Sequence, residues 1–114
     1  MAQNPDLLFS VTAVHSPESC PLNNEDSRQI FLQIGSKARQ NLKKFNIKRM
    51  VDFYMSVLEH QWTLIFEAKN AHDIEKFCIE IGISKYHTLK IVPLSKYVDV
   101  VKKINDGKRA NTDS

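Results

Sequence analysis

Apolar and polar residues alternate along the first part of the chain. Phe9, Val11 and Ala13 lie on one side of the alternation, Ser10 and Thr12 on the other, and the run is rich in β-formers. This period of two predicts a first strand over residues 7–15. His15 continues the apolar side of that strand.

A second type of spacing begins after a loop that holds Pro17 and Pro21. Asn23 or Asn24 can cap a helix, and an apolar residue then recurs every three or four positions: Ile30, Ile34, Ala38, Leu42 and Phe45. This pattern predicts a long amphipathic helix. A shorter helix is expected between Asn70 and Gly82, and a last one between Ser95 and Gly107, because both stretches show the same spacing.

Three further strands are predicted. Residues 47–57 and 62–68 alternate on either side of a turn at 58–61, which indicates a β-hairpin, and a fourth strand is expected over 87–92, ended by Pro93. The order strand, helix, strand, strand, helix, strand is that of an α+β ferredoxin-like fold. Its antiparallel sheet has the order 4-1-3-2, with both helices on one face.

The same pattern predicts the bounds of the domain and the composition of its outer sheet face. Residues 1–106 are predicted to form a single domain with an added C-terminal helix, and residues 107–114 a flexible tail. The sheet face away from the helices is too apolar to be wholly exposed, so we expect a homodimer or higher homo-oligomer that packs sheet on sheet, or a ligand cleft. That face is expected to carry Leu8, Ser10, Thr12, Val14, Tyr54, Ser56, Ile65, Thr88 and Val92.

Chain order brings candidate metal ligands together. In the expected topology His15, the loop with Cys20, the hairpin with His60 and the start of the fourth strand at His87 share one end of the sheet. Alternation within the strands turns the three histidines toward the face that the helices cover. His72 falls at the opposite end and is excluded.

Imidazoles beside a thiolate are ligands that transition metals select. The set His15, Cys20, His60 and His87 predicts a divalent metal site, with zinc favoured by tetrahedral geometry and nickel or copper as alternatives. Glu18 or Glu59 is expected to orient a ligand or move a proton in a metal-dependent hydrolase or lyase. A separation of more than about 10 Å between His15 and His60 would exclude shared coordination.

Composition places this site in an ordinary folded protein. The chain has 114 residues, 42% hydrophobic and 25% charged, with a formal net charge of +3. A core of this size needs no metal for folding, and so small a charge argues for neither a nucleic-acid nor a membrane partner. The first apolar run is too short to span a membrane, so we expect a cytoplasmic protein. Cys20 lies in a loop and Cys78 on the apolar face of a predicted helix, so we expect no disulfide between them in that reducing compartment.

Several short patches resemble a known group of proteins. They are His15-x-Pro17-Glu18-x-Cys20-Pro21, Glu59-His60 before Thr63 to Ala68, and Ile91-Val92-Pro93-Leu94. They look like small, largely uncharacterised ferredoxin-like proteins, which are similar to the dimeric α/β-barrel superfamily and more loosely to its nickel-binding members. The resemblance implies a dimer and a role for metal.

Two other functions are weighed against the metal site. One is a metal-free dimeric α/β-barrel enzyme of the monooxygenase or isomerase type, with His15 and His60 as acid and base and Tyr54 or Trp62 shaping a small-molecule pocket. The other is RNA binding. It is disfavoured because the third strand lacks the glycines and basic start of an RNA-recognition motif.

Overall fold

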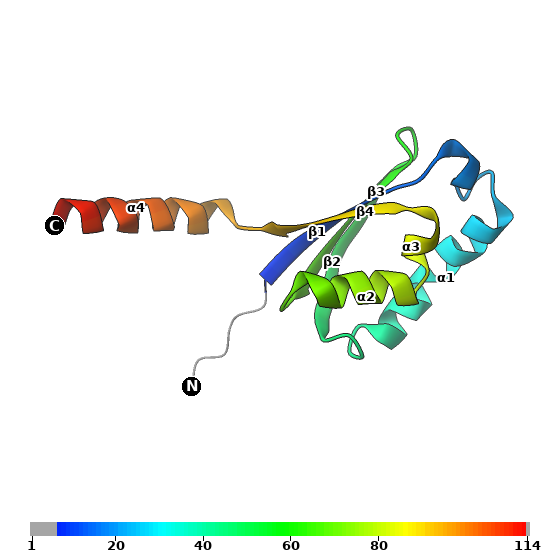
Figure 1. The fold of residues 1–114 in the computed structure, drawn as a ribbon, viewed down its shortest axis with the longest axis horizontal. Coiled ribbons are helices and arrows are strands. Elements are labelled where there is room, and N and C mark those ends of the chain that lie inside the picture. Colours follow the sequence, from blue (N-terminus) through cyan, green and yellow to red (C-terminus); the bar gives the residue numbers. More distant parts are fainter. Residues whose placement is uncertain (1–6, 114) are drawn as a thin grey trace.

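The computed structural model describes the backbone of residues 7–113 and the side chains of residues 7–107. Figure 1 shows a sheet with helices on one side and a last helix that projects from its end. The elements, in chain order, are β1 (Leu7–Val14), the 3₁₀ turn η1 (Pro17–Ser19), α1 (Glu25–Asn41), β2 (Ile47–Ser56), β3 (Gln61–Ala68), α2 (Ala71–Glu80), α3 (Ile83–Tyr86), β4 (Thr88–Leu94) and α4 (Tyr97–Asp113).

The sheet confirms the predicted ferredoxin-like topology. Its strands are antiparallel in the order β2-β3-β1-β4, which is the predicted 4-1-3-2 read from the other edge. The central pair is in continuous register, so Val14 lies opposite Gln61 and also opposite Thr88. The end of β1, the start of β3 and the start of β4 therefore meet at one end of the sheet.

The core lies between the sheet and helices α1 and α2. Phe9, Val11 and Ala13 of β1 are buried there, as the alternation predicts. Phe66 of β3 packs edge to face against Phe77 of α2, with ring centroids 5.5 Å apart. Full burial of each such ring stabilises the fold by about 1.5–3 kcal/mol, so the core holds the strand ends in place.

The caps follow their sequence signals. The Asn24 side chain accepts the backbone N–H of Ser27 at the start of α1, and Asn70 accepts that of Asp73 at the start of α2. Gly82 follows α2 with φ +94°, and a Cβ there would lie 3.3 Å from Ile30. Glycine thus serves both the left-handed backbone and the close approach of α1.

Strand β2 departs from the predicted alternation. Register shifts fall between Ile47 and Arg49 and between Met50 and Asp52. Because each bulge changes which face the next residues occupy, Met50 packs on the core where alternation predicts Val51. Beyond the second bulge, Phe53 and Met55 lie opposite Leu64 and Trp62.

Three boundaries predicted from sequence are wrong. Helix α1 ends at Asn41, so Phe45 lies in the following turn; Pro93 does not end β4 but pairs with Phe9 inside it. Proline is accepted there because β4 is an edge strand. Gly107 does not end the last helix, which continues to Asp113. Helix α3, between α2 and β4, has no counterpart in the prediction.

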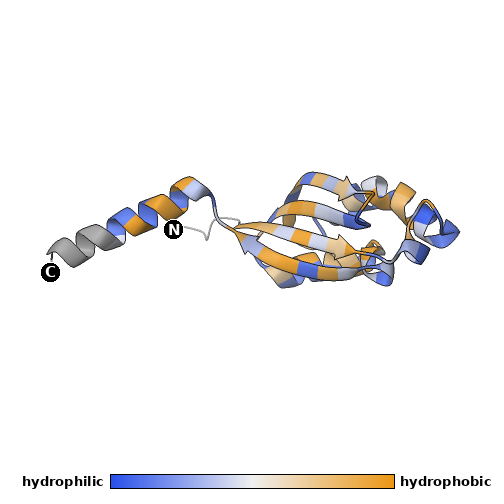
Figure 2. Cartoon of the chain, turned by 90° about the horizontal axis from the view of Figure 1, so that it is seen from above, coloured by the Kyte–Doolittle hydropathy of each residue, from blue (hydrophilic) through white to orange (hydrophobic). Residues whose placement is uncertain are grey.

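The outer face of the sheet and helix α4 are left without a covering layer (Figure 2). Ile65 is half-buried on that face, while Val14, Val92 and Leu94 are exposed. Val98 and Ile104 of α4 are exposed as well. Within the part of the chain that is described, no helix is long and apolar enough to cross a membrane.

Candidate metal centre

His15 follows directly after β1, on the side of the strand that faces the core. Its backbone N–H donates to the carbonyl of His60, with N and O 3.1 Å apart. Its side chain is only 6% exposed. The end of β1 is thus joined to the hairpin after β2 by a backbone hydrogen bond between the two histidines themselves.

His60 closes that hairpin in an unusual backbone conformation. Its φ is +53°, and its N–H donates to the carbonyl of Val57 over 3.4 Å. A left-handed residue other than glycine costs about 1 kcal/mol or more. The turn accepts this cost and directs a half-buried imidazole back over the end of the sheet.

Cys20 enters from the loop before α1. Its N–H donates to the carbonyl of Pro17, and its own carbonyl accepts the N–H groups of Asn23 at 2.8 Å and Asn24 at 2.9 Å. The side chain is 4% exposed, and both cysteines of the chain are free thiols. The turn η1 therefore brings a buried thiol under the hairpin.

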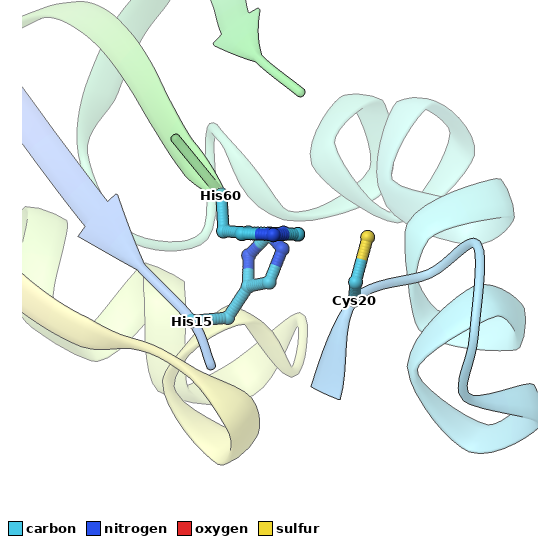
Figure 3. Close-up of side chains that lie close together, drawn as sticks. All are labelled: His15, Cys20 and His60. Carbon is cyan, nitrogen blue, oxygen red and sulfur yellow. The ribbon is translucent and has the colours of Figure 1, made fainter. Parts of the chain in front are cut away.

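These three side chains converge. One ligand atom each from His15, Cys20 and His60 lies within 4.8 Å of the other two, and no other such group occurs among the described side chains. Figure 3 shows the Cys20 thiol beside the His15 and His60 rings, whose centroids are 5.3 Å apart. The separation is far below the 10 Å that would exclude shared coordination.

His87 meets the group in a different way. Its Nε2 lies 3.0 Å from Nδ1 of His15, and its Nδ1 lies 2.8 Å from the carbonyl oxygen of Ile83. Its ring also packs on Trp62, with centroids 4.1 Å apart. His87 thus contacts His15 through Nδ1 and does not belong to the group of three residues that could share an ion.

This chain of hydrogen bonds fixes the protonation of both rings. The carbonyl of Ile83 can only accept, so Nδ1 of His87 carries a proton and donates. In neutral His87 the Nε2 is then an acceptor, so Nδ1 of His15 donates to it. Neutral His15 therefore has a bare lone pair on Nε2. That is the atom a metal ion would need.

Two nitrogens in this cluster lack a hydrogen-bond partner. They are Nε2 of His15 and Nδ1 of His60, and both are buried. A buried polar atom without a partner costs about 1–3 kcal/mol, and folded proteins satisfy nearly all of them. A divalent ion held by the two imidazoles and the Cys20 thiolate would satisfy them, so the residues present fit a metal.

Burial favours the neutral form of His15 and His87. Desolvation lowers the pKa of His15 below 6.5, and the nearby charge of His60 lowers it further. Desolvation also lowers the pKa of His87, partly offset by the carbonyl of Ile83. Cys78 of α2 lies apart, where burial raises the pKa of its thiol to about 12.

The lowered pKa values predict an acid-sensitive metal-free fold. Unfolding returns His15 and His87 to about 6.5, so below that pH the unfolded chain takes up protons that the folded chain does not. The free energy of unfolding should fall as the pH drops through 6.5 and level off below the folded pKa values. Thermal unfolding in chelator at pH 7.5 and 5.5 measures this, and an equal Tm at both would contradict it.

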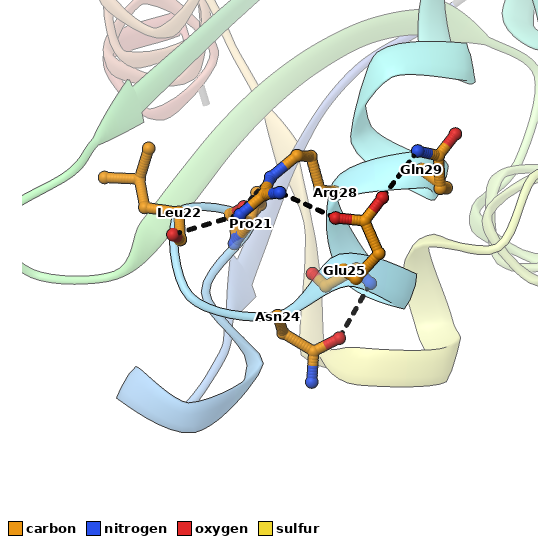
Figure 4. A network of polar contacts seen from close by, with 7 residues as sticks. Pro21, Leu22, Asn24, Glu25, Arg28 and Gln29 are labelled. Carbon is orange, nitrogen blue, oxygen red and sulfur yellow. Dashed lines mark hydrogen bonds and ion pairs between the residues drawn. The ribbon is translucent and has the colours of Figure 1, made fainter.

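Arg28 ties the cysteine loop to α1. It donates to the carbonyl of Pro21 at 2.9 Å and to that of Leu22 at 3.2 Å, while Glu25 holds its Nη1 at 2.6 Å (Figure 4). Gln29 in turn donates to Glu25 at 2.9 Å. Sequence reasoning missed Arg28, because spacing shows its pairing with Glu25 but not the two carbonyls.

Replacing Arg28 by alanine should loosen the Cys20 loop and lower metal affinity by about tenfold, since support residues behind ligands contribute about 10–100-fold. Arg28→Lys should restore little of the loss, because an ammonium lacks the planar fork that reaches both carbonyls. Competition with a chelator measures the affinity. Arg39→Ala on the same helix is the control, and equal affinities for the two alanine variants would refute the role.

The two glutamates predicted as catalytic lie at the rim. Glu18 is exposed in η1, and its pKa is lowered mainly by a hydrogen bond to its own backbone, then by Ser16, with a further contribution from His60. Glu59 is exposed in the hairpin, where its N–H donates to Ser56. Neither carboxylate belongs to the group within 4.8 Å.

A small cavity adjoins the cluster. Its volume is about 70 Å³, and both His15 and Cys20 line it. The other walls come from Pro21, Leu22, Phe31, Met55, Ser56, Val57 and Trp62. The space beside the two ligands is therefore mainly apolar.

Comparison with known proteins supports the fold alone. A conserved protein of unknown function from Bacteroides thetaiotaomicron, described as a possible oxidoreductase, superposes with a TM-score of 0.52 at 12% identity, over 81% of this chain and 98% of that one. At 12% identity this similarity concerns the fold and assigns no function to the chain. No family model and no curated protein sequence matches the chain.

Two further structures match with lower TM-scores. A conserved protein from Methanosarcina mazei has a TM-score of 0.47 at 17% identity, over 79% of this chain and 93% of that one. A dimeric ferredoxin-like protein from an uncultured marine organism has a TM-score of 0.47 at 14% identity, over 82% and 92%. The resemblance to nickel-binding proteins finds no support in these descriptions.

Proposed function

We propose that this protein binds a divalent transition metal, most readily zinc, through His15, Cys20 and His60. Two observations carry the proposal: His15 and His60 each have a buried imidazole nitrogen without a hydrogen-bond partner, and one ligand atom from each of His15, Cys20 and His60 lies within 4.8 Å of the other two. Two nitrogens and one sulfur are a donor set that zinc accepts in tetrahedral geometry. Copper and nickel accept it too, and metal analysis decides among them.

Three protein ligands leave one coordination position for a water or a substrate. When bound, zinc in such a site acts as a Lewis acid and lowers the pKa of a bound water toward about 7. This is the basis for proposing a metal-dependent hydrolase or lyase. The rim position of Glu18, within electrostatic reach of His60, suits a carboxylate that moves a proton or orients a ligand, and Glu59 is the second candidate.

His87 has a supporting role in this proposal. Its hydrogen bonds to Ile83 and His15 present the Nε2 lone pair of His15 to the ion. Outer partners of this kind raise the basicity of a ligand and fix its orientation. We therefore place His87 behind the metal site and not among its ligands.

Metal analysis of protein purified without a histidine tag tests the proposal. We expect about one ion per chain, lost in the double variant His15→Ala/His60→Ala. His72→Ala and Cys78→Ala are matched controls, since each removes a potential ligand far from the cluster and should leave the stoichiometry unchanged. No stoichiometric ion, or equal binding in the double variant, would refute the proposal.

The metal-free enzyme is the second candidate. It would use His15 and His60 as acid and base, and an oxidoreductase of monooxygenase type is one form of it. Pockets for small substrates usually measure about 300–1,000 Å³, whereas the cavity at His15 is about 70 Å³. Activity that persists in excess chelator would favour this candidate, and activity abolished by chelator and restored by zinc would exclude it.

The protein is also proposed to form a homodimer in the cytoplasm. The sheet face away from α1 and α2 carries apolar residues without a covering layer, and a second copy offers the same face. Helix α4 presents Tyr97, Val98 and Ile104, which are 82%, 65% and 63% exposed on their own chain. Apolar side chains left open in this way usually mark an interface. Two free cysteines suit a reducing compartment.

A single charged side chain in the proposed interface should dissociate the dimer. Val92, 37% exposed on the outer face of β4, becomes buried against its copy in a sheet-on-sheet dimer. Val92→Lys should therefore shift the equilibrium to the monomer, because an unpaired charge is costly to bury. Analytical ultracentrifugation measures it, with Ile79→Lys on the outer side of α2 as control. A wild-type monomer, or a dimer indifferent to Val92→Lys, would contradict the arrangement.

A further inference from the structure

The cavity beside the cluster touches two of the three proposed ligands. His15 and Cys20 both line it, while His60 does not. A molecule in this space would therefore lie beside two of the three proposed metal ligands. The position of the cavity, at the end of β2 and under the loop before α1, separates it from the open outer face of the sheet.

The walls of the cavity restrict the chemistry of such a ligand. Phe31 of α1 and Trp62 of β3 are in contact, with ring centroids 5.5 Å apart, and form one side. Leu22, Met55 and Val57 form the rim. The hydroxyl of Ser56 already accepts the N–H of Glu59 at 3.3 Å. A charged tail would lose its hydration here, and the one hydrogen bond that the Ser56 hydroxyl can still donate would offset only part of that loss.

The volume restricts its size. A cavity of about 150 Å³ in an apolar protein core accommodates benzene, which has six carbons, and this cavity is about half as large at ≈ 70 Å³. By that proportion the space holds about three non-hydrogen atoms. A donor atom on the ion with a tail of one to three carbons would fill it.

From these three observations we propose that the open position of the metal takes a small molecule that is uncharged in solution and has one donor atom and a short apolar tail. The inference rests on the proposed function, since it requires an ion on His15, Cys20 and His60. It adds the class of ligand: short-chain thiols, which coordinate as thiolates and release their proton to solvent, enter together with molecules of like size, while molecules with charged tails, sugars and larger metabolites do not.

Cobalt-loaded protein and a series of alkanethiols provide the test. Cobalt accepts the same donor set, and its visible spectrum responds to a new ligand. Affinity should rise about three- to fourfold per methylene from methanethiol to 1-propanethiol, then fall about tenfold at 1-hexanethiol, which overfills the space. 2-Mercaptoethanol has the same donor and nearly the same shape as 1-propanethiol and should bind about tenfold more weakly.

A variant that fills the cavity makes the result specific. Val57 is 56% exposed at the rim, so Val57→Phe can enter the cavity without disturbing the core. It should weaken 1-propanethiol binding by about tenfold or more while cobalt is retained. Val14→Phe, at a position 43% exposed on the other face of the sheet, is the control and should bind like wild type. Affinity that keeps rising to 1-hexanethiol, or no effect of Val57→Phe, would overturn the inference.

A protein that binds no metal at this site would give a different result in the cobalt experiment. If cobalt does not bind stoichiometrically, or binds equally to Cys20→Ala, the proposed function fails and the ligand assignment falls with it. Xenon added to the metal-free protein then reports on the cavity alone, because apolar cavities bind xenon. A shift of the Met55 and Val57 methyl resonances in that case would show a cavity unrelated to metal.

Discussion

Cys20→Ala is expected to lower zinc affinity by at least about a hundredfold. Structural zinc sites with four ligands bind with about 10–16 kcal/mol, so one ligand contributes about 3 kcal/mol, which corresponds to more than a factor of one hundred. The loss should be larger at Cys20 than at a surface residue, because its thiol is 4% exposed and its loop is already ordered by hydrogen bonds. Competition with a chromophoric chelator measures the affinity.

The control for Cys20 is the other cysteine. Cys78 is fully buried in α2, where burial raises the pKa of its thiol to about 12, so it supplies no thiolate near neutral pH. Cys78→Ala should lower the free energy of unfolding through lost packing and leave zinc affinity unchanged. Equal losses of affinity in the two variants would point to a general effect on folding, and the Cys20 assignment would fail.

His87→Phe should lower zinc affinity by about 10–100-fold although it removes no ligand. The phenyl ring keeps the packing on Trp62, but it offers no acceptor to Nδ1 of His15. His15 is then free to carry its proton on Nε2, the atom that faces the site. A lower affinity in this variant would show that His15 can be present and still bind zinc weakly, because its proton lies on Nε2.

Nitrogen NMR of the metal-free protein tests the physical reason directly. In the wild type, the His15 proton should reside on Nδ1; in His87→Phe, both tautomers should be present. His72→Phe, on the exposed surface of α2, should change neither the tautomer nor the affinity. A wild-type His15 with its proton on Nε2 would remove the role of His87, whatever the affinity shows.

The fold was predictable because its signals are local. Alternation placed Phe9, Val11 and Ala13 in the core, Asn24 and Asn70 capped the two helices, and the order of elements left essentially one sheet. Local signals failed where tertiary pairing overrides them. Pro93 is typical of a strand end, yet it lies inside β4, because the outer side of this edge strand has no partner strand. The bulges of β2 move Met50 to the core.

The residues of the candidate site could be predicted from the sequence, but the distances between them could not. Topology alone brings His15, Cys20, His60 and His87 to one end of the sheet, because strand direction and side-chain alternation are properties of chain order. Distances of a few ångströms depend on the φ of +53° at His60 and on the short helix α3, which places the Ile83 carbonyl against His87. Neither feature has a signature in the sequence.

The sequence by itself therefore determined which residues meet, since periodicity and connection order limit the arrangement of strands. Only the tertiary structure decided how they meet. It joins His15, Cys20 and His60 on atoms within 4.8 Å and turns His87 to face His15 at 3.0 Å. The physical reason is that coordination and hydrogen bonding depend on tenths of an ångström and on lone-pair direction, which packing sets and residue order does not.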